Sequence, residues 1–172
     1  IVDLVRAASA HGPVSLVGPP RAGRERQLSS ALRAAGLGRW STGIFGTTDT
    51  AHDRIAAEPG ALAALRDAAD ALRAAGIEVE LVTPLVTPLL FELPAIAALG
   101  HGLSGRRVTL QLYVPDPSVA LAFDQLVPSW SSLRAALGAV SPAHACLEGT
   151  PPCVAPPRLR APGSSLRRPE DP

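Results

Sequence analysis

The run ALAALRDAADALRAAGIEVELVT, residues 61–83, contains the clearest helix-to-strand transition in the chain. Apolar residues recur in its first part at intervals of three and four, as expected for one face of a helix over Ala61–Ala75: Leu62, Leu65, Ala69 and Leu72. Gly76 ends this helix, because glycine adopts a left-handed backbone at little cost. Ile77–Thr83 then alternates between apolar and polar residues, which predicts a strand.

The rest of the chain repeats this helix-and-strand unit. Further strands are expected at Val14–Gly18, Arg39–Phe45 and Arg106–Val114. Helices are expected at Ile1–Ala10, Arg21–Ala35, Leu89–Leu103 and Phe123–Val140. Strands separated by helices pair in parallel through right-handed crossovers. The sequence therefore predicts an α/β fold with about four parallel strands, either a doubly wound sheet or part of a (β/α) barrel.

Polar residues on the last two expected strands favour the barrel. A parallel strand buried on both faces is usually apolar throughout. Here one face carries Glu78, Glu80, Arg107, Gln111 and Tyr113. A barrel lumen that holds a polar ligand accommodates them, with Glu78 and Glu80 contacting that ligand or Arg107. Four strands cannot close a barrel, so this interpretation requires further strands from the N-terminal side or from another chain.

Composition narrows the class of protein. The formal net charge is +1, which argues against a nucleic-acid surface. No apolar run approaches the roughly 18 residues of a membrane helix, and there is no signal peptide, so no membrane partner and a cytoplasmic location are expected. Methionine is absent, even at position 1, so we expect a fragment or a trimmed form. Residues 1–145 are expected to form the barrel domain and residues 146–172 a Cys-, Pro- and Arg-rich tail, disordered over Ala155–Pro172.

The loop Phe45–Gly60, FGTTDTAHDRIAAEPG, follows an expected strand. Ligands gather at the carboxyl ends of strands in α/β sheets and barrels. Thr50 is a candidate helix cap, with Asp53 three residues on. His52 and Asp53 are candidate site residues, although turn and capping roles explain most of these residue types.

The order of residues from this loop onward resembles the middle of radical S-adenosylmethionine (radical SAM) proteins, especially those that modify peptides. That family has an aromatic-Gly pair, a His-Asp segment ending in Gly, a helix ending in Leu-x-x-x-Gly and a Gly-Ile-x-Val strand. Matching positions here are His52, Asp53, Gly60, Leu72, Gly76, Ile77 and Val79. The tail phrase CLEGTPPCVAP, Cys146–Pro156, is similar to the cysteine-rich ending of some members.

The resemblance implies a partial (β/α)₆ barrel that holds a [4Fe–4S] cluster and S-adenosylmethionine. Reductive cleavage of this cofactor gives a 5′-deoxyadenosyl radical, which abstracts hydrogen from a peptide or other polar substrate. Residues expected to bind the cofactor are Ser41, Thr42, Gly43, His52, Asp53, Glu80 and Gln111.

The sequence departs from the family at the cluster and cofactor positions. The C-x₃-C-x₂-C cluster motif is absent, Pro19-Pro20 stands where members often have Asn-Gly, and Gly43 where many have Ser. We therefore expect no cofactor to bind this chain alone, the cluster residing in the parent protein. Cys146 and Cys153 are candidates for an auxiliary cluster or are simply unligated. The alternative function is a degenerate, non-catalytic relative that acts as a binding partner.

Overall fold

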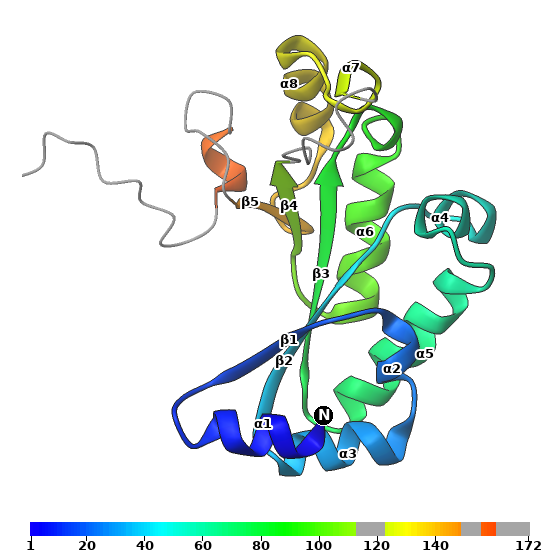
Figure 1. The fold of residues 1–172 in the computed structure, drawn as a ribbon. Coiled ribbons are helices and arrows are strands. Elements are labelled where there is room, and N and C mark those ends of the chain that lie inside the picture. Colours follow the sequence, from blue (N-terminus) through cyan, green and yellow to red (C-terminus); the bar gives the residue numbers. More distant parts are fainter. Residues whose placement is uncertain (113–122, 149–155, 161–172) are drawn as a thin grey trace, which may run out of the picture.

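The sheet has five strands, all parallel. The structure is a computed structural model, and it describes residues 1–112, 123–148 and 156–160. The strands are β1 (Val14–Val17), β2 (Leu37–Gly43), β3 (Glu78–Leu85), β4 (Val108–Leu112) and β5 (Ala145–Glu148). Their order across the sheet is their order in the sequence (Figure 1). The predicted α/β fold with a parallel sheet is confirmed, but the strand count is five rather than about four.

One helix precedes β1, and further helices connect the successive strands. They are α1 (Val2–Ser9), α2 (Pro20–Gly23), α3 (Arg26–Ala34), α4 (Asp49–Ala56), α5 (Ala61–Ala74), α6 (Leu93–Ser104), α7 (Phe123–Leu126) and α8 (Trp130–Ala139), with short 3₁₀ turns η1 (Thr87–Leu89) and η3 (Pro157–Leu159). Within the described ranges no helix is both long enough and apolar enough to cross a membrane.

The strand order decides between the two architectures. Right-handed crossovers between strands that always step in the same direction leave their helices on one face of the sheet. Consistent with this, α3, α5, α6 and α8 contact one another in series, and α5 and α6 lie along one side of β3 (Figure 1). The order of the described strands runs from β1 to β5 across the sheet without turning back. A doubly wound arrangement needs this order to reverse at one point, so it is excluded for these strands.

The core lies between the sheet and this helical layer. Residues of β3 alternate, with Val79, Leu81 and Leu85 buried toward the helices. Thr83 is also buried there, and its hydroxyl donates a hydrogen bond to the Ile44 carbonyl at 3.0 Å. On α6, a Cβ at Gly100 would collide with the Val108 side chain, so glycine lets this helix approach β4 closely.

The single helix predicted over Arg21–Ala35 is wrong. It is two helices, α2 and α3, separated at Arg24 and Glu25. A Cβ at Gly23 would lie 2.9 Å from Leu72 of α5, so this segment packs tightly on the next helix. The buried Ser29 hydroxyl donates a hydrogen bond to the Gly23 carbonyl at 2.8 Å, in the place of a backbone N–H donor.

Proline residues lie where the later predicted helices begin or break. The helix predicted over Leu89–Leu103 begins later, at Leu93, with Pro94 in its first turn, where a missing N–H costs nothing. The helix predicted over Phe123–Val140 is interrupted between α7 and α8. Ser129 caps α8 by accepting a hydrogen bond from the Ser132 N–H.

The last strand lies where a tail was predicted to begin. β5 pairs with β4 from Ala145 to Glu148, so the domain boundary predicted between residues 145 and 146 falls inside a strand. Within Ala155–Pro172, where disorder was predicted, η3 buries Leu159, and Arg160 forms a bridge with Leu147. Ala155 and residues 161–172 lie outside the described ones.

Candidate functional site

One face of the sheet is left uncovered by the described helices; we call it the inner face. Neighbouring strands align its side chains in rows, because paired residues point the same way. Ser41 of β2 is paired with Glu80 of β3, Val82 of β3 with Thr109 of β4, and Gln111 of β4 with Glu148 of β5. A polar surface therefore crosses the sheet.

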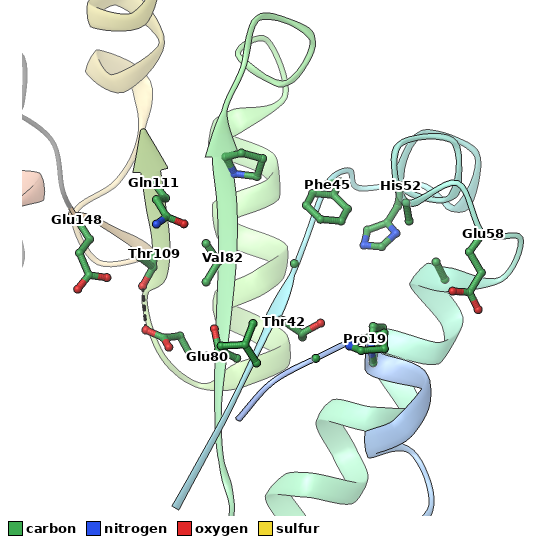
Figure 2. Close-up of a pocket in the computed structure, with 18 residues that line it drawn as sticks. Pro19, Thr42, Phe45, His52, Glu58, Glu80, Val82, Thr109, Gln111 and Glu148 are labelled. Atoms are coloured by element: carbon green, nitrogen blue, oxygen red, sulfur yellow. Dashed lines mark hydrogen bonds between the residues drawn. The ribbon is translucent and has the colours of Figure 1, made fainter. Parts of the chain in front are cut away.

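A cavity of about 720 Å³ lies on this inner face. The β1–α2 and β2–α4 connections border it beyond the strand ends (Figure 2). Its lining residues are Val17, Gly18, Pro19, Pro20, Ser41, Thr42, Gly43, Phe45, His52, Ala56, Glu58, Ala61, Glu80, Val82, Pro84, Thr109, Gln111 and Glu148. Its size suits a small organic ligand.

The structure brings together most of the residues expected to bind a cofactor. The six that line the cavity are Ser41, Thr42, Gly43, His52, Glu80 and Gln111. Asp53 is the exception, since it does not line the cavity. The six come from three strands and a helix, so only the fold makes them neighbours.

His52 is the most unusual side chain of the site. It is 1% exposed, and neither ring nitrogen has a hydrogen-bond partner among the described residues. Its Nδ1 atom is 3.9 Å from Asp53 Oδ1, too far for a hydrogen bond. The Phe45 ring packs against it, with ring centroids 5.4 Å apart. Buried polar atoms without partners are rare and costly, and a bound ligand or water often explains them.

Burial keeps this imidazole neutral. It lowers the pKa of His52 below its ordinary value of 6.5, against the opposing effects of Asp53, the Gly43 carbonyl and Asp49. A neutral imidazole has one donor and one acceptor nitrogen. His52 can therefore pair with a group of either kind, although neither nitrogen is exposed to the cavity in this structure.

Asp53 has a structural role next to His52. Its carboxylate accepts hydrogen bonds from the Gly60 N–H at 2.6 Å and from the Leu62 N–H at 3.0 Å, at the start of α5. The Leu62 N–H is the main cause that lowers the pKa of Asp53 below 3.8. Thr48, not Thr50 as predicted, caps α4 by accepting from the Ala51 N–H.

Gly43 allows Phe45 to fold back over β2. A Cβ at residue 43 would collide with the Phe45 ring. The ring therefore fills the inner-face space that a serine would occupy at this position.

Charged residues collect at the amino end of the inner face. Glu78 pairs with Arg39 at 3.1 Å and with Arg106 at 3.0 Å, whereas the prediction for it was contact with a ligand or with Arg107. A second cavity, of about 300 Å³, is bordered there by these three residues and by Glu80, Arg107, Thr109, Cys146 and Glu148.

No group of three or more His, Cys, Asp or Glu side chains in the described ranges is arranged to hold a metal ion. Cys146 is a free, half-buried thiol on β5 rather than part of a flexible tail. Cys153 lies outside the described residues. A [4Fe–4S] cluster needs several thiolates, and this part of the chain does not provide them.

No protein-family model matches this sequence, and none of the curated proteins does. The function is therefore argued from the site itself.

Among the lining residues that were not predicted to bind a cofactor are the polar side chains Glu58, Thr109 and Glu148. Thr109 had a signal, because it alternates with the core residues Val108 and Leu110. Glu148 had none, since its strand is four residues long and lies in a proline-rich context.

Proposed function

We propose that this chain forms part of a (β/α) barrel whose inner-face cavity binds S-adenosylmethionine, in a radical SAM enzyme acting on a peptide or other polar substrate. The supporting observation is the buried, unpartnered His52 at the edge of a cavity that five other expected cofactor residues also line. A ligand in the cavity would remove the cost of leaving His52 unsatisfied.

The charge of the lining fits this cofactor. Three carboxylates, Glu58, Glu80 and Glu148, line the cavity, and none of the described arginines does, although Arg21 pairs with Glu58 at 2.6 Å. Such a surface favours the positive sulfonium and disfavours phosphate-bearing ligands. The Phe45 ring offers a flat apolar surface for the nucleoside, while Gln111 and Thr42 offer hydrogen-bonding groups.

The described residues do not hold the cluster that the reaction requires. Bound to its cluster, S-adenosylmethionine supplies a 5′-deoxyadenosyl radical that abstracts hydrogen. Here the cluster ligands would come from another segment of the parent polypeptide. The contribution of this chain is to bind and orient the cofactor and substrate.

We further propose that the cavity binds S-adenosylmethionine even without the cluster, contrary to the expectation that no cofactor binds the chain alone. Without the cluster we expect weak binding of S-adenosylmethionine, detectable by saturation-transfer NMR. S-adenosylhomocysteine is the matched probe, because it lacks only the methyl group and the sulfonium charge. We expect S-adenosylmethionine to bind more tightly and His52→Leu to weaken both ligands. Equal binding of the two by wild type and variant would contradict the proposal.

The alternative is a relative that binds without catalysis. It is favoured by the departures from the family pattern at Pro19, Pro20 and Gly43. Anaerobic iron–sulfur reconstitution of the full-length parent separates the two. A cluster seen by absorption and electron paramagnetic resonance supports the enzyme, and its absence supports the binding protein.

A further inference from the structure

Figure 2 shows two ends of the inner-face cavity. His52, Phe45 and Glu58 lie at one end, and the side chains of β3, β4 and β5 at the other. Glu58 is paired with Arg21 at 2.6 Å, so its charge is locally compensated. The end of the cavity formed by the strands contains Glu80 of β3.

Neither Arg39 nor Arg106 neutralises Glu80. Arg39 and Arg106 both bind Glu78, one step closer to the amino end of β3. Glu80 instead accepts a hydrogen bond from the Thr109 hydroxyl at 3.3 Å, and no ion pair joins it to any described residue. A carboxylate oriented by a hydroxyl and half-buried at a cavity wall lacks a counter-charge.

From this arrangement we infer that Glu80 binds a primary ammonium group of the ligand that occupies the cavity. Thr109 orients the carboxylate, and Gln111 of the same strand lines the cavity beside it. An ammonium group donates three charge-assisted hydrogen bonds, which a carboxylate and neighbouring amide and hydroxyl oxygens can accept.

A second observation points independently to a ligand in this cavity. His52 is nine-tenths buried or more, has no partner among the described residues, and borders the same cavity. The inference rests on the proposed function only for the cavity's role in ligand binding; it does not depend on S-adenosylmethionine being that ligand.

Two sources of ammonium are chemically possible. One is a lysine-like amine on the substrate, and the other is the amino group of S-adenosylmethionine itself. Arg107 is a potential internal competitor, because it borders the smaller cavity together with Glu80 and forms no ion pair in the described ranges. If it moved onto Glu80, the site would neutralise itself.

The test is an NMR titration of the ¹⁵N-labelled chain with n-butylammonium chloride, with n-butanol as the neutral isostere at matched ionic strength. We expect saturable amide shifts around Glu80 and Thr109 with the amine only. Glu80→Gln should weaken amine binding about tenfold, as expected for losing a charge-assisted hydrogen bond. Asp70→Asn, the same charge change on the exposed side of α5, should leave it unchanged.

Further measurements distinguish the two sources of ammonium and test Arg107 as a competitor. Arg107→Gln should leave amine binding equal or tighter. Competition between the amine and S-adenosylmethionine assigns the site to the cofactor's amino group, and simultaneous binding assigns it to the substrate. Equal amine affinity in wild type and Glu80→Gln overturns the inference. Amine binding without S-adenosylmethionine binding would uphold it while refuting the proposed cofactor.

Discussion

The two faces of the sheet differ in the side chains that they carry. On the helix-covered face, β3 presents Val79, Leu81 and Leu85, and its buried Thr83 hydroxyl is hydrogen-bonded. On the inner face the same strand presents Glu78, Glu80 and Val82, all half-buried. Next to that face, the ring nitrogens of His52 have no partner in the described structure.

This difference separates stability from function. The helix-covered face buries mainly apolar area, which is how a core stabilises a fold, although the buried Trp40 Nε1 there has no partner among the described residues. The inner face keeps polar groups that add little to folding and that a ligand can use. Substitutions on the helix-covered face should therefore mainly lower stability, and those on the inner face should mainly weaken ligand binding.

The largest difference is expected between neighbouring residues of β3. Leu81→Ala should lower the free energy of unfolding by about 2–5 kcal/mol, because it empties space in a closed core. Val82→Ala, one residue further on the inner face, should cost less than about 1 kcal/mol. Urea denaturation measures both. Similar losses would mean that the inner face is packed like the core.

A second test addresses how tightly the helices cover the sheet. Gly100→Ala places a methyl group against Val108 and should cost about 1–3 kcal/mol by overpacking. Gly102→Ala is the matched control on α6, because nothing lies within 4 Å of its added Cβ. It should instead gain up to about 1 kcal/mol from helix propensity. Thermal melts of the pair decide the point, and equal shifts would contradict close packing at Gly100.

His52 should behave unlike a core residue. His52→Leu removes two unsatisfied nitrogens and should raise stability by about 1 kcal/mol at pH 7 while weakening ligand binding. The folded-state pKa is lowered, so the unfolded chain binds more protons as the pH falls below 6.5. Wild type should therefore lose stability from pH 6.5 down to the folded-state pKa, and the variant should lose less. Urea midpoints across this window measure the effect; a destabilised variant with unchanged binding would argue for a structural histidine.

The smallest change is expected at Asp53 and is confined to acid pH. Because its folded-state pKa is lowered, its contribution is present above 3.8 and is lost as the pH falls through the folded-state value. Asp53→Asn keeps one acceptor for the start of α5 and should flatten this acid dependence with little change in ligand binding. Thermal midpoints at neutral and acid pH provide the measurement. A strong loss of binding would place Asp53 in the site after all.

Local pattern was enough to predict much of the fold. The periodic helix over Ala61–Ala75 and the alternating strand after Gly76 are where the sequence indicates, within a few residues. Both signals come from residues that are close in the chain. The break between α2 and α3 was missed because its cause, the contact of Gly23 with Leu72 of α5, joins distant segments.

The candidate site was only partly predictable for the same reason. His52 and Asp53 are adjacent in the sequence, and both are polar. His52 borders the cavity, whereas Asp53 accepts a hydrogen bond at the start of α5. Residue type cannot distinguish these roles, because direction along a helix decides them. β5 was missed since four residues give too short a pattern.

The unbroken strand order has a consequence for how the chain acquires its structure. Each strand's neighbours in the described sheet are also its neighbours in sequence, so the sheet resembles a repeat array with nearest-neighbour coupling. Each pairing in such an array closes one crossover connection, as between Arg39 and Glu78, and never a longer one. Folding can then start at the central pair β2 and β3 with α5 and spread outward one unit at a time, so the binding surface is completed last at its edges.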